Sequence, residues 1–494
     1  MGMITTLEHL KYLKNSQPIA LCHGVFDVLH EGHLNYLEEA KRLCPTVVVS
    51  VTSDRFVNKG PGRPHFNHST RARMLAALDI VDFVYINDAP RATQLIKEIA
   101  PKLYVKGVEY TQNNELTQGI EEEIDAVRSV GGEVRFIDKP TQSSSHLLNR
   151  FFNSFNTEQN DTLAKIKSIG GIDKIYSVFK EIEKLKVTIV GEPIVDTYVF
   201  CTPEGISSKS PTVSARYNTE ENYAGGALAV ANHVVDFVDT VNLYSPHGKE
   251  SYFQTLRKNQ VDRRILYHEN IYSNYITPRK TRYIDQDKNQ RIFELTNIIE
   301  DIWKNNDPRN FIDDIRNSSR ESEITLLCDF GHGLFENGFL SGCFDLSGMI
   351  ALNCQTNSSN FGFNPYTKHK NFHYLSIDLK EARVAFHDRL SDSRCLFDKI
   401  SATNVSMTLG ANGAIHRQGN YIYKSPAFSN KVIDPIGAGD AYYAITSLMV
   451  KVGAPVEIIP FVGNVFAGLK TNIIGNKFSV TKTQLFKTIN AILK

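Results

Sequence analysis

The sequence predicts an α/β protein with two domains, each built around a mainly parallel β-sheet. The chain has 494 residues, which exceeds the roughly 100–200 residues of one typical hydrophobic core. Apolar, β-branched runs alternate with segments of helical periodicity over residues 18–138 and again from about residue 324 to the end. Such alternation is typical of βα units in a parallel sheet, so two α/β domains are expected.

The first domain is expected over residues 1–155. A strand at 18–26, a helix at 28–43 and a strand at 46–54 form its opening βαβ unit, because β-branched apolar runs favour strands and a 3.6-residue periodicity favours a helix. The elements predicted after this unit are helices at 72–81, 92–100 and 145–155 and strands at 82–88, 102–107 and 131–138.

A linker and a helix are expected over residues 156–186. Residues 156–171 are polar, and residues 172–186 have the periodicity of an amphipathic helix. The second domain, 187–494, begins with an apolar strand, continues with strand-rich segments at 211–223 and 274–295, and returns to βα alternation from residue 324.

Composition excludes several classes of protein. The formal net charge is +1, whereas nucleic-acid binding normally leaves a clustered basic excess. No segment approaches about 18 uninterrupted apolar residues, so no membrane partner and a cytoplasmic location are expected. The seven cysteines are odd in number and contain no Cys-x-x-Cys pair, which predicts reduced, mostly buried thiols.

A first candidate site lies where the strand at 18–26 gives way to a helix. His30 and His33 are three residues apart at this helix start, where free backbone N–H groups favour phosphate binding and both imidazoles can hydrogen-bond a triphosphate. Two histidines alone are more often exposed or capping residues. The glycine, aromatic and acidic residues around them favour a site, and these are Gly24, Phe26, Asp27 and Gly32.

This segment resembles the signature of the cytidylyltransferase-like nucleotidyltransferases, and the resemblance extends over about residues 17–150. It implies a Rossmann-like fold and attack by a sugar or polyol phosphate on the α-phosphorus of a nucleoside triphosphate, with release of pyrophosphate. It also implies that Lys59 contacts phosphate and substrate, with Arg63 as a second candidate.

The same resemblance implies further nucleotide contacts along the chain. Arg71 matches the family's arginine, with Arg73 as a less well placed competitor, and Lys106 opens a turn in which Glu109 replaces the family's aspartate. A hydroxyl-rich phosphate cradle is implied by the residues Ser143, Ser144 and Ser145. Each basic residue alone is more often a solvated surface charge, but together they follow the family's order.

A second candidate site lies before a helical run near the C-terminus. Gly437, Ala438 and Gly439 allow consecutive backbone N–H groups to face one anion, and the dipole of the following helix adds to their charge. Asp440 then stands where a carboxylate can take the proton of an attacking hydroxyl. A helix-capping loop is the alternative interpretation of these four residues alone.

The second half resembles the ribokinase (PfkB) family over about residues 186–494, which implies a three-layer α/β/α fold with a small β lid. The nucleotide contacts that the resemblance implies are Thr408, Gly410 and Gly413. The residues implied to serve magnesium and phosphate through water are Asp378 and Glu381. The implied sugar contacts are Asp196, Gly225 and Gly226.

Within that family the second half resembles the kinase part of the bifunctional heptose kinase/nucleotidyltransferases of lipopolysaccharide precursor synthesis, in which the two domains follow in the opposite order. This likeness implies that Lys280 and Arg282 lie near a sugar phosphate and that Asp329 belongs to the sugar side. The chain departs from the family at Glu192, Ala229, His332 and residues 352–364. These departures predict altered acceptor specificity.

The resemblances together imply a bifunctional enzyme that phosphorylates a sugar, expected to be a heptose phosphate, and converts a sugar 1-phosphate into a nucleoside diphosphate sugar for surface polysaccharide synthesis. They imply Mg²⁺, ATP as phosphoryl donor, ATP or CTP as nucleotidyl donor, and a homodimer formed through the lid strands. Two alternatives stay open. In the first, the kinase half is a non-catalytic sensor or dimerisation module. In the second, both halves are active enzymes that act on a polyol or pentose phosphate.

Overall fold

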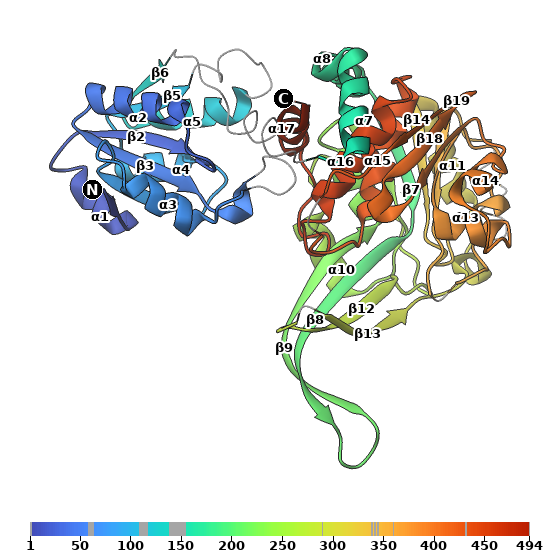
Figure 1. Ribbon diagram of the computed structural model, residues 1–494. Coiled ribbons are helices and arrows are strands. Elements are labelled where there is room, and N and C mark those ends of the chain that lie inside the picture. Colours follow the sequence, from blue (N-terminus) through green and yellow to red (C-terminus); the bar gives the residue numbers. More distant parts are fainter. Residues whose placement is uncertain are drawn as a thin grey trace. The chain divides into compact units, whose positions relative to one another are not determined.

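The computed structural model describes residues 2–57, 64–107, 117–137, 155–288, 290–336, 339, 342, 345–358, 360–429 and 432–493. The chain forms two compact units (Figure 1), which are Met1–Asn156 with Phe486–Lys494 and Thr157–Leu485. Among the described helices, none combines the length and apolar character needed to cross a membrane.

The first unit contains a six-stranded sheet in the order β1-β4-β3-β2-β5-β6, and each strand runs parallel to its neighbours. Its strands are β1 (Met3–Ile4), β2 (Ile19–Gly24), β3 (Thr46–Thr52), β4 (Phe83–Asn87), β5 (Leu103–Gly107) and β6 (Glu133–Ile137). Its helices include α1 (Leu7–Leu13), α2 (Glu31–Leu43), α3 (His68–Ala76), α4 (Thr93–Ile99) and α5 (Thr117–Ser129).

Helices cover both faces of this sheet, and the central strand β2 shows why. Its side chains alternate between faces: Ala20 and Cys22 belong to one hydrophobic cluster, while Ile19 and Leu21 belong to another. The predicted strands and helices up to residue 137 are all present, with ends shifted by a few residues. The helix expected at 145–155 falls on positions of which all but the last lie outside the described residues.

The second unit is built on a nine-stranded sheet in the order β11-β10-β7-β14-β15-β16-β17-β18-β19. Its strands are β7 (Lys186–Gly191), β10 (Thr240–Tyr244), β11 (Ile265–His268), β14 (Ile324–Asp329), β15 (Met349–Cys354), β16 (Tyr374–Asp378), β17 (Asn404–Thr408), β18 (Ala414–Gln418) and β19 (Tyr421–Ser425). The helices around it are α9 (Ala227–Val234), α10 (Ser251–Gln260), α11 (Arg309–Glu321), α13 (Leu379–Ala385), α14 (Ser393–Asp398), α15 (Ala438–Lys451) and α16 (Ile458–Lys470). A last helix, α17 (Lys482–Leu493), ends the described chain.

Five neighbouring strands of this sheet run parallel, from β7 through β14, β15 and β16 to β17. Their carboxyl ends therefore meet at one edge, which is where open α/β sheets bind ligands. The last residues of these strands are Gly191, Asp329, Cys354, Asp378 and Thr408.

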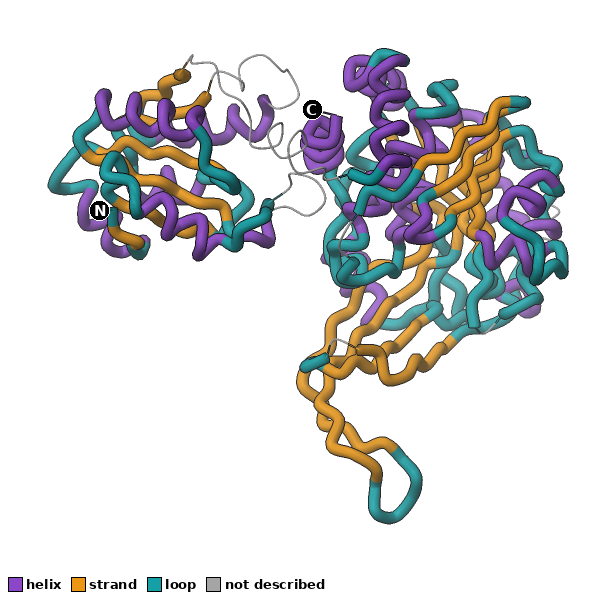
Figure 2. The backbone as a smooth tube through the Cα atoms, in the orientation of Figure 1, coloured by secondary structure: helices purple, strands orange, loops and turns teal. Residues whose placement is uncertain are grey.

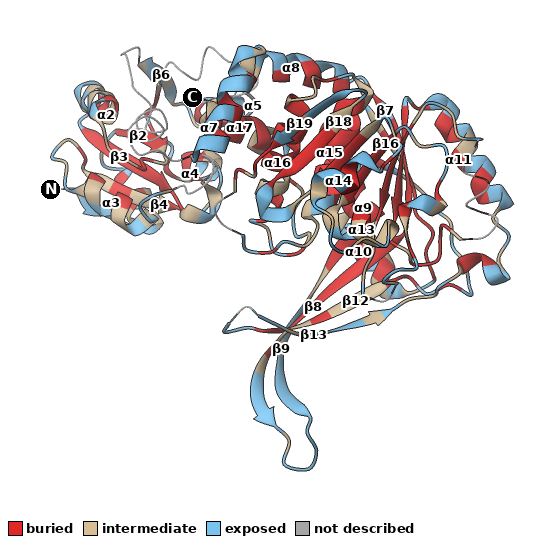
Figure 3. Cartoon of the chain, turned by 45° about the vertical axis from the view of Figure 1, so that its right-hand side comes forward, coloured by how far each residue is buried: buried red, intermediate tan, exposed pale blue. Residues whose placement is uncertain are grey.

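A second, four-stranded sheet forms the predicted lid, in the order β13-β12-β8-β9. Its strands are β8 (Pro193–Ile206), β9 (Val213–Gly226), β12 (Arg279–Asp285) and β13 (Gln290–Asn297). The hairpin of β8 and β9 projects from the unit (Figure 2). It is buried at its base and exposed along its outer half (Figure 3): Val195 is fully buried, whereas Ile206 is 75% exposed.

Residues 157–168, which the sequence predicts to be part of a polar linker, form helix α7 (Thr157–Ser168), followed by α8 (Gly171–Ile182). Leu163 and Ile166 of α7 are buried, and the Gln159 amide donates to the Ala427 carbonyl. A few apolar side chains and several tertiary polar contacts, which include the ion pairs Glu158–Lys424 and Lys165–Glu457, thus stabilise a helix in a segment whose mean composition is polar.

Gly226 lies at the base of the lid, where it is the last residue of β9 and the N-cap of α9. Its φ is +61°, and a Cβ there would overlap the Glu192 carbonyl oxygen and lie 3.0 Å from Cγ1 of Ile194. We expect Gly226→Ala to destabilise the second unit by about 2–4 kcal/mol. Denaturant unfolding followed by the fluorescence of Trp303, the single tryptophan of the chain, measures this loss.

Gly419→Ala is the matched control. Gly419 has a φ of +60° but no atom within 4 Å of a Cβ built on it, so it isolates the backbone strain, at about 1 kcal/mol. If the two variants lost the same free energy of unfolding, the overlap with the Glu192 carbonyl oxygen would add nothing to the backbone strain.

Candidate active sites

The two histidines predicted from the sequence lie side by side at the start of α2. His30 caps the helix, and its Nδ1 accepts the Gly32 N–H at 3.1 Å. The ring centroids of His30 and His33 are 4.0 Å apart, and the Phe26 ring lies 5.2 Å from that of His33. The histidine pair lies just after the carboxyl end of β2. The strand order reverses at β2, because β3 pairs with one of its edges and β5 with the other, and open α/β sheets bind ligands at such a point.

The residues before the histidines shape this loop. Phe26 has a φ of +51°, and a Cβ on Gly24 would lie 3.1 Å from the Phe26 ring, so the glycine provides room for that ring. Asp27 is fully buried and accepts the backbone N–H groups of His65 at 2.7 Å and Phe66 at 3.2 Å. The motif thus ties the β2–α2 loop to the segment that precedes α3.

Arg71 is also fully buried. Its guanidinium donates to the carbonyl oxygens of Phe66 and Thr52, each at 2.8 Å, and to that of Val25. It also forms a 2.6 Å ion pair with Asp54. In this conformation Arg71 joins the loops around the histidine pair, and its predicted nucleotide contact stays a prediction.

Lys106 lies near the end of β5, next to β2, and is 6% exposed. Its Nζ is 3.1 Å from Oε2 of Glu123, which also accepts the Tyr104 hydroxyl at 2.8 Å. The other carboxylate oxygen, Oε1, accepts the Ala92 N–H at 2.9 Å. Burial alone would raise the pKa of Glu123, but the Lys106 ammonium and these hydrogen-bond donors together outweigh burial and lower the pKa to about 2. Glu123 therefore stays ionised and holds Lys106 at this edge.

Several predicted residues of the first site lie outside the described residues. They are Lys59, Glu109, Ser143, Ser144 and Ser145, together with the alternative Arg63.

The second candidate site begins at the N-terminus of α15. Gly437 caps this helix with a φ of +75°, and Ala438, Gly439 and Asp440 form its first turn. Asp440 is buried, and its Oδ1 accepts the side-chain N–H of Gln355 at 2.5 Å. Gln355 follows β15 directly and belongs to the segment 352–364, for which the sequence predicts altered acceptor specificity and no contact with Asp440.

The environment of Asp440 suits a general base. Burial raises the pKa of Asp440 to about 6, the nearby Asp196 carboxylate contributes to the rise, and the Gln355 hydrogen bond opposes it. Lys280 and Lys470 also lower the pKa of Asp440 through their charges. A carboxylate with a pKa of about 6 is ionised at neutral pH and still a better proton acceptor than an exposed aspartate.

Asp196 and Arg282 form a buried ion pair of 2.5 Å between β8 and β12. A Cβ on Gly225 would overlap the Asp196 carboxylate, so the absence of a side chain at Gly225 leaves space for this pair. The base of the lid therefore brings together the sugar-side residues that the sequence predicts.

Lys280 and His332 offer hydrogen-bond donors without protein acceptors. Within the described part of the chain, the Lys280 ammonium makes no hydrogen bond or ion pair, and burial lowers its pKa. His332 is fully buried, both ring nitrogens lack a hydrogen-bond partner there, and burial together with the charge of Lys280 lowers its pKa to about 3. An anionic group between them would satisfy both side chains.

Glu192 fixes the loop that carries His332. It is fully buried, and its two carboxylate oxygens accept the backbone N–H groups of Phe330 at 2.9 Å, His332 at 3.1 Å and Leu334 at 3.2 Å. Burial and the neighbouring Asp329 raise the pKa of Glu192. This departure from the family pattern therefore has a structural role in positioning the imidazole.

The Asp329 carboxylate, which the sequence predicts on the sugar side, has hydrogen-bond and ion-pair partners within the protein. One carboxylate oxygen accepts Asn364 at 3.1 Å, and the other lies 2.7 Å from His369 Nε2 and 2.9 Å from Lys368 Nζ. Burial alone would raise the pKa of Asp329, but these partners outweigh it and lower the pKa.

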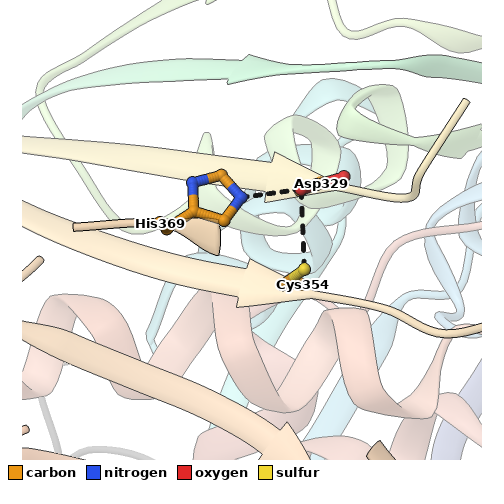
Figure 4. A group of neighbouring side chains, drawn as sticks. All are labelled: Asp329, Cys354 and His369. Atoms are coloured by element: carbon orange, nitrogen blue, oxygen red, sulfur yellow. Dashed lines mark hydrogen bonds and ion pairs between the residues drawn. The ribbon is translucent and has the colours of Figure 1, made fainter. Parts of the chain in front are cut away.

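Figure 4 shows Asp329 with Cys354 and His369, whose ligand atoms lie within 4.8 Å of one another. Two observations favour a hydrogen-bonded cluster over a metal centre. The Lys368 ammonium already occupies Asp329, and burial raises the pKa of the Cys354 thiol well above its usual range, whereas metals bind the thiolate.

Asp378 and Glu381 form a capping box at the start of α13. Asp378 accepts the Glu381 N–H at 2.6 Å, and Glu381 accepts the Asp378 N–H at 2.8 Å and the Thr356 N–H at 3.3 Å. Burial, together with Asp378, raises the pKa of Glu381 well above its usual range. Asp378 is only partly buried and can still bind a magnesium-bound water, because Mg²⁺ usually keeps several waters in proteins.

The predicted nucleotide turn follows β17, which pairs with β16 so that Thr408 lies opposite Asp378. Gly410 and Gly413 both have positive φ, and a Cβ on Gly413 would overlap the Ser425 carbonyl oxygen. The turn is closed by the Leu409 N–H, which donates to the Gly413 carbonyl at 2.8 Å. These residues lie at the same sheet edge as Asp378.

Comparison with protein families matches two segments of the chain. Residues 21–156 match the model described as cytidylyltransferase-like, and residues 378–481 match the pfkB family carbohydrate kinases. The chain joins a nucleotidyltransferase-like segment to a pfkB-like segment. These matches agree, in family and in order along the chain, with the two resemblances predicted from the sequence.

Curated relatives of the chain include bifunctional HldE proteins. HldE of Campylobacter fetus subsp. fetus is 38% identical over 133 residues, which are 26% of this chain and 29% of that protein. HldE of Helicobacter pylori is 39% identical over 110 residues, 22% of this chain and 23% of that protein. The chain spans less than a third of the length of these relatives.

Solved structures confirm the ribokinase-like fold. Arabidopsis thaliana ribokinase complexed with ribose and ATP has a TM-score of 0.50 and 17% identity, covering 63% of this chain and 99% of that chain. Escherichia coli phosphofructokinase-2 in complex with substrates and products has a TM-score of 0.52 and 12% identity, covering 63% of this chain and 100% of that chain. At such identities the likeness establishes the fold alone.

The buried pair of Lys106 and Glu123 gives a pH-dependent prediction. Because Glu123 has a folded pKa of about 2 against 4.5 unfolded, its contribution is complete above about pH 4.5 and is lost as the pH falls towards 2. We expect Glu123→Gln to destabilise the first unit by on the order of 3 kcal/mol at pH 7, and by progressively less below pH 4.5. Native-state hydrogen exchange of the β5 amides measures the loss.

Glu122→Gln is the control, since Glu122 is half exposed and pairs with Arg91 at the surface. Its expected effect is at most about 1 kcal/mol at any pH. A loss for Glu123→Gln that does not change with pH would exclude the ion pair as its cause.

Proposed function

We propose that the chain is a bifunctional sugar-activating enzyme. Its pfkB-like half phosphorylates a sugar, a heptose phosphate at its anomeric hydroxyl, and its cytidylyltransferase-like half converts a sugar 1-phosphate into a nucleoside diphosphate sugar for cytoplasmic synthesis of surface polysaccharide precursors. The main support is the presence in one chain of two phosphate-handling sites, the pair His30 and His33 on α2 and the turn before Asp440 on α15.

In the first reaction the sugar hydroxyl loses its proton to Asp440 as its oxygen attacks the γ-phosphorus of ATP. The bond from that phosphorus to the bridging oxygen breaks, and ADP leaves. The backbone N–H groups of Gly437, Ala438 and Gly439 and the dipole of α15 stabilise the charge on the transferring group. Asp378 with Glu381 would hold Mg²⁺ through water, and the ion would neutralise phosphate charge when bound.

The acceptor is positioned from the base of the lid. Asp196, which Arg282 holds in place, accepts sugar hydroxyls, while Lys280, Arg282 and His332 supply donors for an anionic group of the sugar. The unsatisfied nitrogens of buried His332 support a phosphorylated acceptor over a neutral sugar, because unbonded buried donors are costly. The partly buried Lys280 ammonium supplies a positive charge for the same group.

In the second reaction an oxygen of the sugar 1-phosphate attacks the α-phosphorus of a nucleoside triphosphate, ATP or CTP, and pyrophosphate leaves. No covalent enzyme intermediate is required. The two histidines hydrogen-bond the triphosphate as charge grows on the leaving oxygens, so the catalysis is positioning and charge stabilisation.

The direct test supplies purified chain with Mg²⁺, each nucleoside triphosphate in turn and a panel of heptose, pentose and polyol phosphates. Mass spectrometry then identifies the nucleotide sugar formed. Release of neither ADP nor pyrophosphate from any member of the panel would overturn the proposal. Pyrophosphate release without ADP would instead support a sensor role for the kinase half.

Two substitutions separate the reactions. We expect Asp440→Asn to lower kcat for ADP formation by at least about 100-fold while leaving pyrophosphate release from sugar 1-phosphate unchanged. His33→Ala is expected to do the reverse, with a loss of about 100-fold in pyrophosphate release. Each variant is the folding control for the other, and parallel loss of both activities in either one contradicts the assignment.

The pH profile of the kinase reaction reports on Asp440. Since its carboxylate has to be ionised and its pKa is raised to about 6, kcat/KM is expected to fall about tenfold per pH unit below pH 6. Gln355→Leu removes a donor that stabilises the charged form of Asp440. The pKa of Asp440 therefore rises, and the acidic limb of the profile moves to higher pH. The substrate phosphate titrates equally in both enzymes, and identical profiles would mean that Asp440 does not set the limb.

Pairing of two copies through the lid is part of the proposal. The outer half of the hairpin exposes Ile206, Val213 and Tyr217, and β13 exposes Phe293 and Leu295. Burial of these apolar side chains against a second copy favours a dimer. Light scattering of the purified chain measures the mass.

A further inference from the structure

Lys470, the last residue of α16, is fully buried. Lysines are almost never fully buried unless they are paired. Yet among the described residues no carboxylate lies within ion-pair distance of its Nζ. The ammonium instead donates to two backbone carbonyl oxygens, those of Ile436 at 2.8 Å and Gly475 at 2.6 Å.

The position of this ammonium relates it to the kinase site. Ile436 directly precedes the turn of Gly437 to Gly439, and a Cβ built on Gly437 would lie 3.2 Å from Cε and 3.5 Å from Nζ of Lys470. The charge therefore lies directly against the turn whose N–H groups face the transferring phosphoryl group in the proposed function.

The nearby carboxylates do not neutralise Lys470 by contact. Asp434 is occupied by the Tyr198 hydroxyl, Arg291 and two backbone N–H groups, and Asp440 by Gln355. Burial lowers the pKa of Lys470, while Asp434, Asp440 and Asp196 act in the opposite direction. The fold thus keeps a buried cation whose only direct partners are uncharged.

We propose that Lys470 is a tethered monovalent cation of the kinase site, which orders the Gly437 turn through two carbonyls and adds a fixed positive charge behind it. The inference rests on the proposed kinase reaction. Lys470 does not touch the substrate, so it is a positioning residue. Carbonyl oxygens are also the ligands that free potassium prefers, so loss of the ammonium group alone should leave a space at the two carbonyls that a small monovalent cation can fill.

Lys470→Met tests this, because it keeps much of the side-chain volume and removes the charge. With the sugar that the wild type accepts, in tetramethylammonium salts, we expect kcat for ADP formation to fall about 100-fold. Ammonium chloride, and to a smaller extent potassium chloride, should restore part of the lost kcat. Neither salt should stimulate the wild type.

Lys470→Gln separates charge from hydrogen bonding, since its amide can donate to one carbonyl but carries no charge. It is expected to lose kcat as Lys470→Met does. Lys424→Met, at a half-exposed lysine paired with Glu158, is the matched control and should behave as the wild type. Trp303 fluorescence checks that each variant is folded.

Thermal unfolding gives a second measurement, independent of catalysis. Ammonium ions that fill the cavity stabilise the folded state by mass action, so ammonium should raise the Tm of Lys470→Met above the value in tetramethylammonium and leave that of the wild type unchanged. Because the Tm of the same variant is compared in two salts, the measurement remains valid if Lys470→Met is less stable than the wild type.

The outcomes are distinct. Full kcat in Lys470→Met, or a loss in folded protein that neither cation relieves, would overturn the role of the charge. The absence of any shift in Tm with ammonium would overturn the cation cavity. A wild type that phosphorylates no sugar would contradict the proposed function, while the Tm measurement would still decide whether the cavity binds a cation.

Discussion

The second unit depends on the bonds made by one carboxylate, that of Asp434. It accepts the Tyr198 hydroxyl from β8 at 2.7 Å, Arg291 from β13 at 3.0 Å and the backbone N–H of Gly475 at 2.8 Å. It also accepts the N–H of Ile436, two residues further along its own loop. A single buried group therefore fixes the positions of three elements relative to one another. These are the lid, the turn of Gly437 to Gly439 and the turn around Gly475 after α16.

Sequence alone predicts the fold class and the local phosphate motifs for a physical reason. In a βα unit the strand, the loop and the helix N-terminus are contiguous, so one short pattern contains the whole arrangement. His30 with His33, and Gly437 with Asp440, are such cases, and the structure places each set together at a helix start. The elements that carry them were equally predictable, because apolar periodicity determines which faces are buried.

The rest depends on contacts between residues far apart in sequence. Gln355 reaches Asp440 across 85 positions, Glu192 bonds a loop about 140 positions away, and no periodicity encodes such partners. The sequence did contain one usable signal, a lysine at the end of the apolar run of α16. Helix α7 was missed because the few side chains it buries are outnumbered by polar ones.

The long hairpin of the lid has a mechanical consequence. The register of β8 and β9 shifts at Phe200/Cys201, and such irregularities bend a strand and increase its twist. On the inner side of this bend lie Asp196 and Tyr198, and on the outer side lies the exposed arm. The inner segment carries Asp196, and through Tyr198 and Asp434 it is hydrogen-bonded to the loop that leads into the Gly437 turn. A change in the bend of β8 would therefore displace Asp196 and the loop of Asp434 together, because both are attached to the same strand.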